Sequence, residues 1–127
     1  MSLAGCRSSG FLTADTAVNV GQCKLVSIHG VNVGANLAAG APAFVPITLN
    51  LYDNASAATG KIVAKVQLGV TSYDGSAGNF GPTSIEFDMH GVICRNGLYA
   101  DIVIPTAVAG GHASQNAATS GFTIEFA

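Results

Sequence analysis

Charge is scarce in this sequence, and its scarcity excludes several classes of partner. Only 9% of the 127 residues are charged, five basic and seven acidic, whereas a typical soluble domain has about a quarter. Five lysine and arginine residues are too few to neutralise a row of phosphates, so we expect no nucleic-acid partner. No apolar run approaches the length that spans a bilayer, so we expect no membrane partner either. A surface this poor in charge is typical of a protein that hides part of it against other subunits.

The sequence also lacks the motifs of catalysis and of cofactor binding. Gly-x-Ser-x-Gly, both glycine-rich phosphate loops and Cys-x-x-Cys are absent. The three histidines, His29, His90 and His112, do not have the spacing of metal ligands. We therefore expect neither enzymatic activity nor a bound cofactor.

Cysteine occurs three times, as Cys6, Cys23 and Cys94. An odd number of cysteines, with no visible secretion signal, indicates reduced thiols, although one internal disulfide remains an alternative. Cys23 and Cys94 are flanked by ordinary strand residues, where a free cysteine behaves as a small buried hydrophobe. We expect both of these thiols to be buried.

What the sequence has in abundance is the alternation of apolar and polar residues that half-buried β-strands show. The alternation runs through residues 45–52, 62–68, 85–90, 98–104 and 122–126, and no window shows a helical stripe. The expected fold is an all-β, antiparallel two-sheet β-sandwich of about seven or eight strands, either jelly-roll or immunoglobulin-like. Alanine at Leu49 or Phe87 should cost about 2–5 kcal/mol if these side chains are buried. The predicted core consists of Ile47, Leu49, Leu51, Val66, Phe87, Ile102 and Ile124.

Glycine and the N-terminus give finer predictions. Gly30 lies where the apolar phase of its strand changes, which indicates a β-bulge at this residue. Asn96-Gly97 is the strongest hairpin signal in the chain. We expect an N-terminal arm with a possible edge strand over residues 1–17, followed by the β-sandwich over residues 18–127.

One strand carries residues with metal-binding or acid–base chemistry. Glu86, Asp88 and His90 lie at positions i, i+2 and i+4, so their side chains should point the same way. Carboxylates beside a histidine suit a divalent cation or proton transfer. The solvent-facing side of a half-buried strand shows the same pattern, and we favour that interpretation. We expect no tightly held metal at these residues.

The segments best suited to contact another chain have little charge and many small residues. They are residues 1–11, 34–43 and 105–120. Small side chains let two backbones approach closely and lose little rotamer entropy when they are fixed. Nearby aromatic side chains can anchor an interface or stack on sugar rings, although tryptophan, which often stacks on sugars, is absent. The candidate interface residues are Ser2, Leu3, Phe11, Leu37, Pro42, Phe44, Tyr73, Phe80, Val108 and His112.

Four segments carry a resemblance to a known group of proteins. They are QCKLVSIHGVN (residues 22–32), LYDNASAATG (51–60), GVICRNGLYADI (91–102) and the closing strand FTIEFA (122–127). A strand that ends in a turn like LYDNAS, followed later by a hairpin with GV and NGLY, resembles small structural proteins of tailed bacteriophages. The resemblance is greatest to phages of marine bacteria and cyanobacteria. It implies a β-sandwich that is part of a virion.

The resemblance and the low charge together suggest a role. The first hypothesis is a capsid decoration (cement) protein that binds the major capsid protein and braces the shell. It would be made in the bacterial cytoplasm, would lie on the capsid surface of the virion, and would self-associate as a dimer or trimer. The alternative is a tail, neck or fibre module that binds a host glycan.

Overall fold

The computed structural model describes residues 5–33, 46–69, 71–72, 80–81, 83–104 and 120–127. The described chain forms β-strands joined by turns and contains no helix. The β-branched and aromatic residues that alternate along these strands fit a pleated, half-buried surface. In chain order the strands are β1 (Arg7–Leu12), β2 (Thr16–Val20), β3 (Cys23–Asn32), β4 (Ile47–Tyr52), β5 (Ile62–Leu68), β6 (Thr71–Ser72), β7 (Phe80–Gly81), β8 (Thr83–Cys94), β9 (Gly97–Val103) and β10 (Gly121–Phe126).

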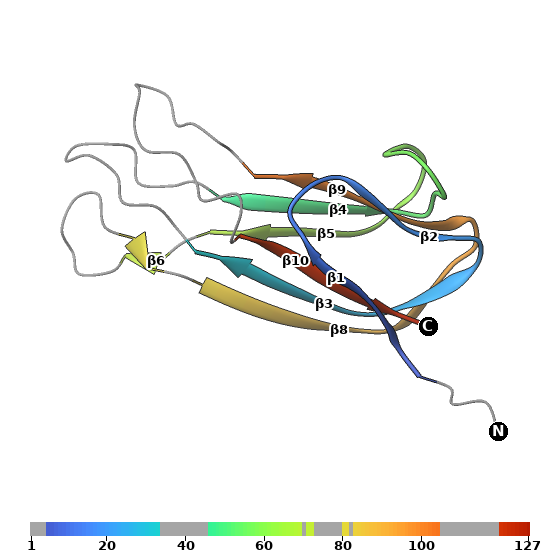
Figure 1. Cartoon of the computed structure of the whole chain (residues 1–127), viewed down its shortest axis with the longest axis horizontal. Helices are drawn as coiled ribbons and strands as arrows, with labels where there is room; N and C mark the ends of the chain where they lie inside the picture. Colours follow the sequence, from blue (N-terminus) through green and yellow to red (C-terminus); the bar gives the residue numbers. More distant parts are fainter. Residues whose placement is uncertain (1–4, 34–45, 70, 73–79, 82, 105–119) are drawn as a thin grey trace.

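Eight of these strands form two four-stranded antiparallel sheets that pack face to face (Figure 1). Sheet A has the order β1-β10-β3-β8 and sheet B the order β2-β9-β4-β5, while β6 and β7 pair separately. The pairs β1–β10, β2–β9, β3–β8 and β4–β5 are those of a long antiparallel hairpin whose successive pairs lie alternately in sheet A and sheet B. The predicted all-β sandwich is therefore confirmed, and its strand order is that of a jelly roll. An immunoglobulin-like order would instead place β1 beside β2.

The core lies between the two sheets, on the faces that the sequence alternation selects. Along β4, Ile47, Leu49 and Leu51 have no exposed area, whereas the residues between them are half-buried. Six of the seven predicted core residues are buried: Ile47, Leu49, Leu51, Val66, Ile102 and Ile124. The remaining buried apolar residues of this cluster are Cys23, Leu25, Ile28, Leu68, Cys94, Leu98, Ala100, Phe122 and Phe126.

Phe87 is the predicted core residue that the structure places elsewhere. Its side chain is 37% exposed, so this prediction was wrong. The phase of the strand is nevertheless right, because Ile85 and Met89 pack against the core and Phe87 lies opposite the buried Ile28 of β3. β8 is the last strand of sheet A. A side chain on the inner face of an edge strand has neighbours on one side only, and so Phe87 remains partly uncovered.

The bulge predicted at Gly30 does not lie there: against β10 the extra residue is Val26, and against β8 the extra residues lie on β8 itself, between Asp88 and Val92. Gly30 pairs in regular register with both neighbouring strands, whereas both ladders shift between Leu25 and Ser27. A Cβ atom at residue 30 would lie 2.9 Å from Cε1 of Phe122. A glycine within a strand marks either a bulge or the close approach of another group, and here it is the second. The sequence pattern alone does not distinguish the two cases.

The N-terminal segment belongs to the sandwich from Arg7 onwards. The predicted edge strand exists as β1, where Ser9 Oγ accepts a hydrogen bond of 2.9 Å from the Ile124 N–H. The Arg7 guanidinium lies 4.6 Å from the centre of the Phe126 ring, within the range of a cation–π contact. The predicted domain boundary after residue 17 falls inside β2.

Candidate functional site

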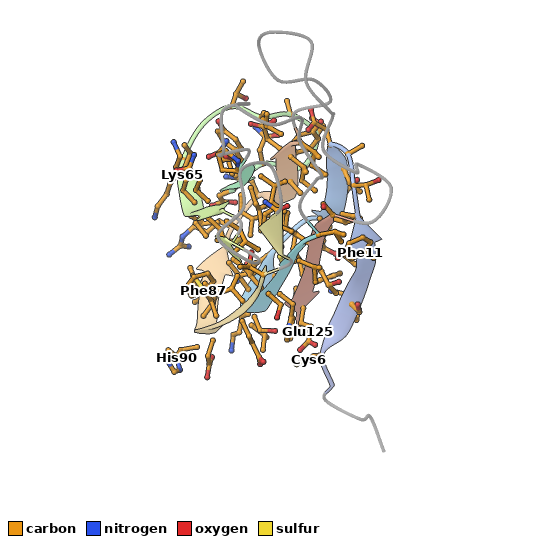
Figure 2. All side chains as sticks on the ribbon, turned by 90° about the vertical axis from the view of Figure 1, so that its left-hand side faces the viewer. Cys6, Phe11, Lys65, Phe87, His90 and Glu125 are labelled. Carbon is orange, nitrogen blue, oxygen red and sulfur yellow. The ribbon has the colours of Figure 1, made fainter. Side chains whose placement is uncertain are left out.

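Only one of the ten predicted interface residues has a side chain among the described residues. Phe11 lies on the edge strand β1, opposite Thr123 of β10, and its side chain is 48% exposed (Figure 2). Phe80 belongs to β7 by its backbone, and its side chain lies outside the described residues. The other eight lie outside the described residues altogether: Ser2, Leu3, Leu37, Pro42, Phe44, Tyr73, Val108 and His112.

The strands that flank the predicted interface segments end at the same end of the sandwich (Figure 1). Val31 pairs with Gly121, so β3 ends where β10 begins. Thr48 pairs with Val103, so β4 begins where β9 ends. The described residues that flank 34–45 and 105–119 in the sequence therefore lie at one common end of the sandwich.

Buried polar groups hold this end of the two sheets together. The Asn32 side-chain amide is fully buried and donates a hydrogen bond of 2.9 Å to the Leu68 carbonyl in the opposite sheet. The Val33 N–H donates to the hydroxyl of the buried Ser120 at 3.0 Å. A buried polar group costs free energy unless it is hydrogen-bonded, so these bonds define the positions of the strand ends.

The predicted trio of Glu86, Asp88 and His90 does not act as one group. Asp88 Oδ1 accepts a hydrogen bond of 2.9 Å from the His90 N–H and lies 3.4 Å from His90 Nδ1. His90 has a positive φ of 54°, so the strand alternation on which the trio depends breaks at His90. Glu86 instead lies beside His29 of the neighbouring strand.

His29 is the centre of a polar cluster on the outer face of sheet A that sequence spacing did not reveal. Its Nε2 atom lies 3.1 Å from Ser27 Oγ and 3.3 Å from Glu125 Oε1. Its Nδ1 atom lies 3.9 Å from Glu86 Oε2. Three adjacent strands, β3, β8 and β10, contribute these residues, which are far apart in the sequence. Only the strand order brings them together.

A serine, a histidine and carboxylates in contact are the components of a nucleophilic triad, but their geometry here is different. A triad needs an acid hydrogen-bonded to the ring nitrogen remote from the serine, and N–H donors aimed at an oxyanion. At 3.9 Å, Glu86 is beyond hydrogen-bond distance from His29 Nδ1. The β3 backbone around Ser27 is paired with β8 on one side and with β10 on the other, so its N–H groups take part in the sheet. In the part of the chain that the structure describes, no three His, Cys, Asp or Glu side chains are grouped to hold a metal ion. The cluster is best described as a polar surface.

A second surface lies where β5 and β8, the last strands of the two sheets, come together; we call it the β5/β8 edge. Figure 2 shows Lys65, Phe87 and His90 along this side of the molecule. The edge exposes apolar side chains, with Ile62 46% and Ile93 50% accessible. Its β8 half carries Glu86 and Asp88, and its β5 half carries the exposed Lys65. The edge therefore combines apolar side chains with opposite charges on its two strands.

At the far end of the sandwich, the two motifs that carry the phage resemblance touch each other. The Asp53 carboxylate, from LYDNAS, accepts hydrogen bonds from the N–H groups of Arg95, Asn96 and Gly97, at 3.0, 2.7 and 3.3 Å. Asn54 Oδ1 accepts from two N–H groups of its own turn, at 2.9 and 3.0 Å. The hydrogen bond from Asn96 N–H is the main cause that lowers the pKa of Asp53 below its usual 3.8. The motifs therefore stabilise two turns and are structural in this chain. The hairpin predicted at Asn96-Gly97 was wrong: β8 lies in sheet A and β9 in sheet B, so this turn connects the two sheets and the strands beside it do not pair.

Replacing Asp53 with alanine should lower the free energy of unfolding by about 1–2 kcal/mol, because three N–H groups lose a charged acceptor that is half exposed. Asparagine keeps one acceptor oxygen, so Asp53→Asn should cost less. Because the folded pKa is lowered, this stabilisation is present above the usual pKa of 3.8 and is lost as the pH falls through the folded value. Urea unfolding of wild type and Asp53→Ala at neutral pH and at strongly acidic pH measures both effects. A difference between the two proteins that is independent of pH would contradict the assignment.

The three cysteines are free thiols, as the sequence predicts. Cys23 of β3 and Cys94 of β8 are buried and directly opposite each other in the ladder, whereas Cys6 is exposed. Burial raises the pKa of the Cys94 thiol to about 11 and also raises the pKa of Cys23. Both thiols therefore remain protonated at neutral pH and contribute as core residues, since the thiolate is the reactive form.

Comparison with known proteins identifies no relative: no protein family, no curated protein and no solved structure matches this chain. Among the residues described, no helix is long and apolar enough to cross a membrane.

Proposed function

We propose that this chain is a non-enzymatic structural protein of a virion, a capsid decoration (cement) protein that binds the lattice of the major capsid protein and stabilises the shell. The observation that carries the proposal is a surface with very little charge. Only 9% of the residues are charged, and apolar side chains such as Phe11 and Val20 are exposed at the sheet edges. Such a surface suits a protein that is covered by neighbouring subunits.

The sandwich supports this role as a rigid platform for binding segments. Residues 34–45 and 105–119 are rich in Ala and Gly, and the core strands that precede and follow them in the sequence meet at one end of the sandwich. Binding segments carried on a rigid scaffold are a common arrangement in proteins. Each copy needs only modest affinity, because contacts repeated over a lattice and within an oligomer add up. Jelly rolls also occur in viral capsid and lectin domains, which supports the proposal only by analogy of fold.

The test uses phage particles assembled without this subunit. Added full-length protein should saturate the particles at a copy number comparable to that of the major capsid protein, and should raise the temperature at which they release DNA. A variant that lacks residues 2–6 keeps the whole of β1, so it should unfold like the full chain but occupy fewer sites. Equal occupancy of the two proteins would remove these residues from the contact.

Two other outcomes would contradict the proposal. Saturation at a few copies would indicate a neck or tail position. Failure to bind the heads, combined with adsorption to host cells that a soluble glycan inhibits, would support the alternative of a glycan-binding tail module.

A further inference from the structure

We propose that two copies of this chain form a symmetric dimer through the β5/β8 edge, with β8 of each copy pairing antiparallel with β5 of the other. The two sandwiches would then share two continuous eight-stranded sheets. This inference does not depend on the proposed function, because it concerns the isolated protein in solution.

The β5/β8 edge has long stretches of regular strand, and the opposite edge does not. An edge strand presents unpaired N–H and C=O groups, which proteins protect with bulges, charges or short strands. At the opposite edge, the β1 ladder shifts between Ser8 and Phe11, and the β2 ladder shifts between Ala17 and Asn19. At the β5/β8 edge, residues 64–68 of β5 and 83–88 of β8 are in unbroken register with their inner neighbours. Among the described residues, no other strand pairs with these two stretches on their outer side.

Apolar side chains at this edge lack cover that a second copy would supply. Phe87 and Val92 lie opposite the buried residues Ile28 and Leu25, yet each is 37% exposed. Val63 of β5 is also only partly buried against the core. In the dimer, the inner faces of the partner's sheets continue those of the first copy. The exposed part of these side chains would then lie within one common core, and burial of apolar area favours association.

Strand direction permits the pairing on both sheets at once. The Asn32 side chain bonds to Leu68, and the Asn32 backbone pairs with Thr83, so β5 ends at the level where β8 begins. The two strands are therefore antiparallel within one copy. A twofold axis parallel to the strands leaves the strand directions unchanged and exchanges the levels of the two sheets. It therefore places each β8 beside the partner's β5, and the outer faces of the two paired sheets point to the same side. Each copy uses both strands of its β5/β8 edge in this contact, so the interface joins two copies and no more.

Register and charge agree with this arrangement. Leu68 and Thr83 lie at the same height along the sandwich. Lys65 is three residues before Leu68 and Glu86 is three residues after Thr83, so Lys65 of one copy lies opposite Glu86 of the other. Lys65 is exposed on the outer face of β5, and the Glu86 side chain is 72% exposed on the outer face of β8. Opposite charges directly across two strands stabilise the pairing, whereas like charges there oppose it. The dimer would contain this pair twice.

The experiment measures the mass of the full-length protein by analytical ultracentrifugation over a range of concentrations. We expect a dimer for wild type, and a dissociation constant raised at least about tenfold for Lys65→Glu and for Glu86→Lys. The double variant Lys65→Glu/Glu86→Lys restores an opposite pair and should recover dimerisation. Lys24→Glu, a matched charge reversal on the interior strand β3, should dimerise like wild type. Thermal unfolding of each variant verifies that the monomer is folded.

Hydrogen exchange locates the contact. Amides of residues 64–68 and 83–88 should become more protected as the concentration rises through the dissociation constant. A wild-type protein that is monomeric at every soluble concentration would overturn the proposal. So would a dimer whose protection lies on β1 and β2, or a double variant that dimerises no better than the single ones.

Discussion

Replacing Phe122 with alanine should lower the free energy of unfolding by about 3–5 kcal/mol, the usual cost of removing a buried phenylalanine. The ring has no exposed area and lies on β10, an interior strand of sheet A. The cavity cannot collapse easily, because the backbone beside the ring is part of two ladders. Phe11→Ala is the matched control: it removes the same ring from the half-exposed position on edge strand β1, so it should cost much less. Equal losses in urea unfolding would contradict the packing described here.

The same ring explains why residue 30 is a glycine, and this contact is testable by a double-mutant cycle. In wild type, Gly30→Ala places a Cβ atom 2.9 Å from Cε1 of Phe122, so it should destabilise by about 1–3 kcal/mol through overpacking. In the Phe122→Ala background the nearest obstacle is gone and only the movable Ile85 Cγ2 atom, at 3.3 Å, is close, so the same change should cost much less. Additive effects of the two substitutions would show that the ring does not determine the glycine.

Gly97→Ala is the second substitution with a large expected effect, about 2–6 kcal/mol from two separate causes. The φ angle of Gly97 is +151°, a backbone conformation that residues other than glycine rarely adopt. A Cβ atom there would also lie 2.6 Å from the Asn19 carbonyl oxygen and 2.8 Å from the Ala55 Cα. Both are backbone atoms, so neither can turn aside as a flexible side chain would.

Gly60→Ala separates the two causes. Gly60 has a φ of +91°, and a Cβ atom added to it would meet nothing within 4 Å, so alanine there incurs strain without a clash. Its cost should be about 1–2 kcal/mol, clearly below that of Gly97→Ala. If the two variants unfold at the same urea concentration, close packing around Gly97 is not the reason for its large effect.

The prediction that failed at Phe87 shows where sequence periodicity loses information. The alternation of β8 identifies the correct face, since Ile85 and Met89 pack against the core. Burial, however, depends on what covers that face, and a sequence pattern does not tell an edge strand from an interior one. Gly30 is a similar case, because its neighbour Phe122 is distant in sequence.

The polar contacts also depend on strand pairings that sequence spacing does not reveal. Glu86, Asp88 and His90 are joined by a spacing that can be seen in the sequence, yet Glu86 lies beside His29 rather than His90. The contact of His29 with Glu125 requires β10 to lie beside β3. The hydrogen bonds of Asp53 likewise depend on bringing together two turns that are far apart along the chain. Sequence spacing identifies the residues that are able to bond, but not their partners.

By itself, the sequence determined the all-β class, the inner face of β4 and the presence of a turn at Asn96-Gly97, because these depend on residues close together along the chain. Local sterics and the two-residue period of a strand are sufficient to fix such features. That this turn crosses from sheet A to sheet B, and is not a hairpin, follows only from the strand order. Only the tertiary structure decided the jelly-roll order, the His29 cluster and which two strands come last in the described sheets at the β5/β8 edge. These features depend on pairings between distant strands, which are selected by the burial of the whole core at once and by no single segment.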